Sequence, residues 1–147
     1  MAKFQDQLAE FTGNVQIANL RFQKFEFDVA FGDLGSGAAD AIALSDFPTG
    51  VFVMAASVEI LDAFAGEGDL AMTVGDTGDA DGLMGSVNLD GVAAGTVLNA
   101  FGAEQGFRYE ADLGTAGLAA AFAATELDDV TAGSLRVRIY YATPMAD

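Results

Sequence analysis

Apolar and polar residues alternate with a period of two along most of the chain after residue 23. In residues 24–31, Phe25, Phe27, Val29 and Phe31 fall on one face, and polar or small residues fall on the other. This pattern predicts a half-buried β-strand. Turn residues such as Pro48 and Gly50 separate the strand-like segments. The other predicted strands are residues 38–44, 51–64, 69–74, 83–89, 106–113, 117–125 and 134–142.

Eight short strands and no sustained helical period indicate an all-β fold. The count is typical of an antiparallel β-sandwich of the jelly-roll-like kind, in which two sheets bury one face of each strand. The alanines of residues 113–124 would also suit a helix, but Gly114 and Gly117 disfavour one. We therefore expect one sandwich domain over residues 24–147.

The first 23 residues follow a different pattern, which predicts an N-terminal arm. Its first half has apolar residues at helical spacing, and Thr12, Gly13 and Asn14 then interrupt them. The arm is expected to be part short helix and part extended chain, and to attach or link subunits, because so many apolar side chains would otherwise be solvated. The alternative is that it folds back on its own domain. The predicted interface residues are Phe4, Leu8, Phe11, Ile17, Leu20, Arg21 and Phe22.

The composition restricts the chemistry that the chain can perform. Histidine, cysteine and tryptophan are all absent. Ser-His-Asp and Cys-His catalysis are therefore excluded within this chain, and a zinc ion would have carboxylate ligands alone. A carboxylate-based hydrolase stays open as a weaker alternative, although 22 acidic residues make any one pair uninformative. We expect no enzymatic activity and no cofactor.

The net charge of −16 is distributed unevenly. Residues 25–107 hold fourteen acidic residues and no basic one, whereas residues 1–24 carry a net charge of +1. Such a field repels phosphate, so binding to nucleic acid is disfavoured. The longest uncharged runs have thirteen residues, too few to span a bilayer, and Asp6 and Glu10 interrupt any signal peptide. We expect neither a nucleic acid nor a membrane as partner.

The densest acidic cluster lies in residues 75–82. Asp76, Asp79 and Asp81 on this glycine-rich loop could gather around Ca²⁺, the one metal ion that the sequence suggests. The spacing fails the EF-hand pattern, and aspartate and glycine are also common in plain turns. A turn is therefore the stronger interpretation, and the calcium site is its alternative.

Two pairs in the last predicted strand suggest how its faces are used. Tyr140 and Tyr141 are adjacent, so one ring should face the core and the other the outside, where it could anchor an interface. Arg136 and Arg138 share a face and are expected to offset acids on neighbouring strands.

Several segments resemble a group of small tailed-bacteriophage virion proteins. They are the strand, turn and strand of residues 41–53, residues 59–64, residues 70–76 ending in Val-Gly-Asp, and residues 129–137 with Thr-Ala-Gly before an arginine-bearing strand. The resemblance implies a jelly-roll-like sandwich that decorates or cements the capsid, often as a trimer.

The leading hypothesis is thus a non-enzymatic structural protein of a phage particle. It would be made in the host cytoplasm and would bind the major capsid protein on the capsid exterior as a homotrimer. The alternative is a head-fibre or tail component that acts as a calcium-assisted glycan-binding module.

Overall fold

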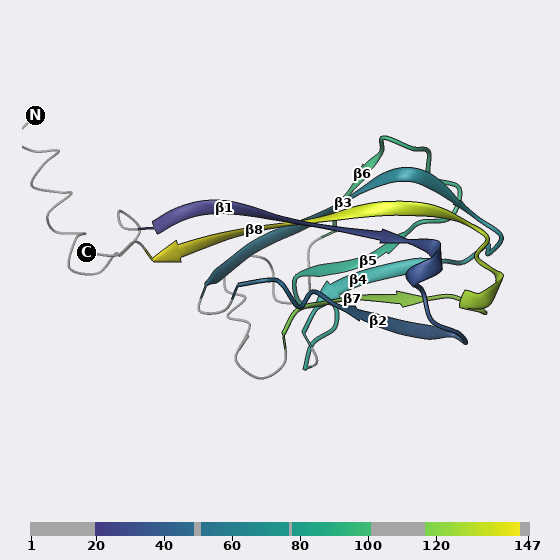
Figure 1. Ribbon diagram of the computed structural model, residues 1–147, viewed down its shortest axis with the longest axis horizontal. Helices are drawn as coiled ribbons and strands as arrows, with labels where there is room; N and C mark the ends of the chain where they lie inside the picture. The colour runs from purple at the N-terminus through teal and green to yellow at the C-terminus, as the bar shows by residue number, and fades with distance from the viewer. Residues whose placement is uncertain (1–19, 49–50, 77, 101–116, 145–147) are drawn as a thin grey trace, which may run out of the picture.

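The computed structural model describes residues 20–48, 51–76, 78–100 and 117–144, which form eight β-strands and two short 3₁₀ turns (Figure 1). The strands are β1 (Leu20–Ala30), β2 (Ala39–Ala43), β3 (Phe52–Ala65), β4 (Ala71–Gly75), β5 (Met84–Asn88), β6 (Val97–Leu98), β7 (Ala119–Ala123) and β8 (Ala132–Pro144). The 3₁₀ turns are η2 (Phe31–Asp33) and η3 (Leu127–Asp129).

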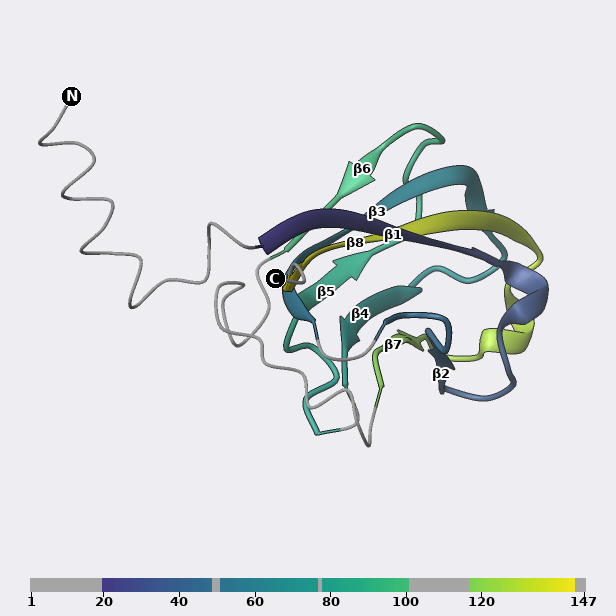
Figure 2. The same ribbon diagram turned by 60° about the vertical axis from the view of Figure 1, so that its left-hand side comes forward.

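The strands form two four-stranded sheets that lie one above the other (Figures 1 and 2). Sheet A has the order β1-β8-β3-β6, and sheet B has the order β2-β7-β4-β5. The antiparallel pairs are nested, because β1 pairs with β8, β2 with β7, β3 with β6, and β4 with β5. This nesting is the wrapping of a jelly roll. The predicted eight-stranded antiparallel sandwich is confirmed.

Two differences between the observed and the expected strands affect the topology. β1 begins at Leu20, so strand pairing includes four residues that the sequence pattern assigned to the arm, and Leu20 is opposite Pro144. The second difference is β6, a strand that the sequence pattern did not predict, in which Val97 and Leu98 pair with β3. Two residues are too few to produce a recognisable alternation. The predicted strand at residues 106–113 and the predicted helix of the arm lie outside the described residues.

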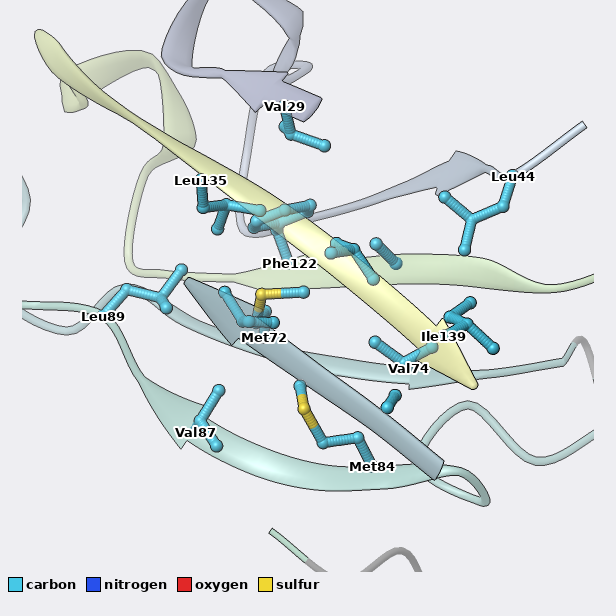
Figure 3. Close-up of a cluster of buried hydrophobic side chains, with 14 of the residues drawn as sticks. Val29, Leu44, Met72, Val74, Met84, Val87, Leu89, Phe122, Leu135 and Ile139 are labelled. Atoms are coloured by element: carbon cyan, nitrogen blue, oxygen red, sulfur yellow. The ribbon is translucent and has the colours of Figure 1, made fainter. Parts of the chain in front are cut away.

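The core lies between the sheets and follows the predicted alternation. Leu135, Val137 and Ile139 of β8 are fully buried in the same hydrophobic cluster as Met72 and Phe122 of sheet B. Figure 3 labels four of these five side chains, all except Val137. Burying large aliphatic and aromatic side chains from both sheets supplies the main stabilisation of such a sandwich.

A cluster of three aromatic rings closes one end of the core. Phe47 lies in the turn after β2, and its ring meets those of Phe25 and Tyr141 edge to face, each at a centroid distance of 5.2 Å. Edge-to-face contacts are a preferred geometry for aromatic pairs. Tyr141 therefore faces the core, as expected for one member of the tyrosine pair, and Tyr140 faces outward with 41% of its surface exposed.

A close backbone approach shapes the opposite end of sheet A. Gly133 has a φ of +124°, a conformation that suits glycine, and a Cβ at this position would overlap the ring of Phe64. Packing thus explains the glycine of the Thr-Ala-Gly stretch, which runs into the first two residues of β8, since only glycine leaves room for this ring.

Candidate interface on the outer face of sheet A

The outer face of sheet A carries a row of charged side chains on three neighbouring strands. The register puts Asp28 of β1 opposite Arg136 of β8, and puts Arg136 opposite Glu59 of β3. One step along, Glu26 is opposite Arg138. Because alternate residues of a strand share a face, all five side chains are on the same side of the sheet.

These charges form a connected set of ion pairs. Arg136 holds Asp28 with two hydrogen bonds of 2.7 and 3.0 Å, and its Nε lies 3.4 Å from Glu26. Arg138 bonds Glu59 across to β3. Lys24 lies 2.9 Å from Glu26. The predicted role of the two arginines, to offset acids on adjacent strands, is confirmed.

The electrostatics of this row follow from these contacts. The hydrogen bond from Lys24 lowers the pKa of Glu26, and the hydrogen bonds from Arg136 lower the pKa of Asp28. The bond to Glu59 raises the pKa of Arg138. Three acids are matched by three bases, so this part of the surface is neutral in a chain whose net charge is −16.

An aromatic patch adjoins the ion-pair row at the end of the sheet where β1 begins. We define it as Phe22, Phe52, Met54 and Tyr140 around the small residue Ala142. Phe22 and Phe52 are the two cross-strand partners of Ala142. They are 63% and 48% exposed, and Met54 is 37% exposed, whereas Ala142 between them is 1% exposed. Four large apolar side chains are thus exposed on three neighbouring strands near Ala142.

A bulge in β3 creates half of this patch. The register with β8 shifts between Val53 and Ala55, which places Met54 at the irregularity. A regular strand would put Phe52, Met54 and Ala56 on one face. In the structure Ala56 is buried, while Phe52 and Met54 are exposed. The sequence pattern did not single out these two residues, because both faces of residues 51–64 are largely apolar and nothing in the pattern locates the bulge.

The outer face of sheet B has a different character. The outward positions of β2, β7 and β4 hold alanines, Thr73 and Gly75, since Ala41 is opposite Ala121 and Ala121 is opposite Thr73. None of these side chains is large or charged. Interfaces are usually anchored by aromatic residues and arginine. The aromatic patch on sheet A is therefore the better candidate for an interface.

Two of the predicted interface residues have described side chains, and both are solvent-exposed. Phe22 belongs to the aromatic patch, and Arg21, its neighbour in β1, is exposed on the opposite face of the strand. Leu20 is the first residue of β1. The remaining ones, Phe4, Leu8, Phe11 and Ile17, lie outside the described residues, so the prediction for the arm stays a prediction.

The acidic loop after β4 is a tight turn in which Asp76 caps the backbone. The Oδ1 atom of Asp76 accepts hydrogen bonds of 2.8 Å from the amides of both Gly78 and Asp79. A Cβ on Gly75 would overlap the carbonyl of Asp79, which explains the glycine of the Val-Gly-Asp stretch. Within the described ranges, Asp76, Asp79 and Asp81 are not part of a group of three or more side chains placed to hold a metal ion. The Ca²⁺ site stays a prediction.

A second carboxylate contact joins the loop before β4 to the end of β7. Asp69 accepts hydrogen bonds of 2.9 and 2.8 Å from the amide and hydroxyl of Thr125, and these bonds lower the pKa of Asp69. Glu67 accepts a bond of 3.1 Å from the amide of Glu126. These contacts fix the loops at the end of sheet B, and sequence spacing gave no sign of them because the partners are more than fifty residues apart.

Comparison with known proteins adds one likeness. No protein-family model and no curated protein matches the chain. Among solved structures, a chain of the cyanophage Pam1 capsid asymmetric unit aligns with a TM-score of 0.55 and 22% sequence identity, over 86% of this chain and 86% of that chain. The two chains share a fold. Since the alignment covers the same share of both, they are of nearly equal length. Across the part of the chain that the structure describes, no helix is long and apolar enough to cross a membrane.

Proposed function

We propose that this protein is a non-enzymatic structural component of a phage particle, which binds the capsid exterior as a decoration or cement protein. The observation that carries the proposal is the fold that it shares, over most of both chains, with a similarly sized chain of a phage capsid. The resemblance of its turn and strand-end segments to phage virion proteins supports the same conclusion.

The surface chemistry fits a protein that works by contact. The described part of sheet A offers a neutral row of ion pairs beside large exposed apolar side chains. The partner would be the major capsid protein, and the paired charges would set the register of that contact. Self-association as a homotrimer would present several such surfaces to the shell at once, which raises the overall affinity.

The absence of histidine and cysteine from the sequence supports a role without turnover. Binding at a capsid requires shape and charge complementarity, and this chain can supply both from aromatic, arginine and carboxylate side chains. The residues that contact the shell would come from the exposed faces described above.

Co-sedimentation with empty shells tests the proposal. The shells are made by expressing the major capsid protein of the genome that encodes this chain, and purified protein is added in increasing amounts. We expect saturable binding at a fixed number of copies per shell, and mass spectrometry of purified particles should find the chain. No binding to shells, together with calcium-dependent binding on a glycan array, would overturn the proposal in favour of the glycan-binding alternative.

A further inference from the structure

The aromatic patch gathers exposed apolar side chains on three adjacent strands of sheet A. Phe22, Phe52 and Tyr140 surround Ala142 on adjacent strands, and Met54 extends the patch along β3. Single exposed apolar residues are ordinary, whereas a contiguous patch on a soluble domain is a sign of a binding partner.

Among the residues that the structure describes, the patch has no unbalanced charge beside it on its own face of the sheet. Lys24 shares the face of Phe22 but is paired with Glu26 in the neutral row, and Arg21, the neighbour of Phe22 in β1, lies on the opposite face. A partner for this patch should therefore be mainly apolar.

The segment that best meets this description belongs to the chain itself. We propose that residues 1–19 of a second copy pack on the aromatic patch and so hold copies together. This segment has large apolar side chains at Phe4, Leu8, Phe11, Val15 and Ile17, and acidic ones at Asp6 and Glu10. The inference deepens the proposed function, in which copies associate, but it needs no contact with the shell.

The position of the segment supports the exchange. Residues 1–19 join the described chain at Leu20, two residues before Phe22, so the donor segment and the acceptor patch are at the same end of the molecule. Copies that meet at this end can each donate the segment to a neighbour and so form a closed, symmetric oligomer. The sandwich domain keeps its fold in such an exchange.

The direction of β1 favours a second copy over the same chain. Phe22 lies only two residues after the start of β1, so the segment would have to reverse its direction immediately before Leu20 to cover its own patch. A segment that continues in line with β1 leads away from its own domain and can reach the patch of a neighbour.

Cross-linking with single cysteines tests the proposal, because the chain has no cysteine of its own. One full-length preparation carries Leu8→Cys and a second, of distinguishable mass, carries Met54→Cys; Phe4→Cys and Phe11→Cys replace Leu8→Cys in parallel mixtures. We expect at least one mixture to form a disulfide-linked dimer with one chain of each kind. The control places the acceptor cysteine at Ser36, which is exposed in the loop after η2, and should give at least tenfold less product.

Two outcomes would overturn the inference. In the first, the mixtures give no dimer, but a chain that carries both cysteines forms an intramolecular disulfide at high dilution. The segment then packs on its own domain. The other is equal product with Met54→Cys and Ser36→Cys, because the contact is then unspecific.

Light scattering provides an independent measurement. The double variant Phe22→Ser/Phe52→Ser should fall to monomer mass at tens of micromolar with an unchanged far-ultraviolet spectrum, whereas Phe31→Ser, which alters another exposed phenylalanine, should remain oligomeric. A double variant that keeps the oligomer contradicts the inference, as does a monomeric parent protein. Either result leaves the shell-binding assay, and hence the proposed function, to be decided separately.

Discussion

Replacing Phe122 by alanine tests the assignment of inner and outer faces on which every surface argument depends. The Phe122 side chain is 1% exposed and lies between the sheets, so truncation removes a whole ring from a closed core. A change of this kind costs about 3–5 kcal/mol of the free energy of unfolding. In a chain of this size each kcal/mol lowers Tm by roughly 2–4 °C, so the expected loss is roughly 6–20 °C.

The matched control is Phe31→Ala, which removes the same ring from the η2 turn, where it is 42% exposed. We expect a loss of about 1 kcal/mol or less there. Urea unfolding followed by circular dichroism gives both free energies, and thermal melts give both Tm values. Equal losses for the two variants, or a loss below about 1 kcal/mol for Phe122→Ala, would refute the reasoning that Phe122 fills the space between the sheets.

Three further predictions concern charge and backbone. The hydrogen bonds from Arg136 make the pKa of Asp28 lower in the folded state than in the unfolded state. The ionised Asp28 therefore stabilises the fold fully at pH values above its pKa in the unfolded state, and this contribution is lost as the pH falls through its pKa in the folded state. Urea midpoints measured from pH 6 to pH 2 should therefore fall less steeply for Asp28→Asn than for the parent, and parallel curves would contradict this role. Gly133→Ala should lower Tm by at least several degrees, because its Cβ would overlap the ring of Phe64 in a backbone conformation that suits glycine; an unchanged melt would show that the ring can move aside. Added monovalent salt should raise Tm, since it screens the repulsion of a net charge of −16; a rise with micromolar Ca²⁺ alone would instead revive the calcium site.

The alternation of apolar and polar residues was sufficient to predict the strands wherever one face of a strand is exposed to solvent. In β8 the apolar residues Leu135, Val137 and Ile139 are all buried, and the intervening arginines face outward as expected. The same periodicity failed at the bulge in β3, because an extra residue exchanges the two faces and leaves no mark on a sequence that is apolar throughout. The pattern also extended the first strand to Phe31, which instead begins the η2 turn.

The candidate interface was predictable only in part. Phe22 was identified from the apolar excess near the amino terminus and Arg21 from its positive charge. The tyrosine pair predicted that one of Tyr140 and Tyr141 faces outward, without indicating which. Phe52 and Met54 were missed, since their exposure depends on the bulge and on the pairing of β3 with β8 across some eighty residues of sequence. Long-range register of this kind is a property of the folded chain and has no local signal.

The nested strand order has a consequence for how the protein is made. Among the strands that the structure describes, β1 pairs with β8 alone, and the Arg136–Asp28 contact joins residues 108 positions apart in the chain. A high contact order of this kind slows folding, because a long loop must close before its contacts form. Sheet A cannot be completed until β8 has left the ribosome, and a chain truncated before Ala132 leaves β1 without a partner and β3 with one side unpaired. Such a fragment exposes two long strand edges, which are templates for aggregation.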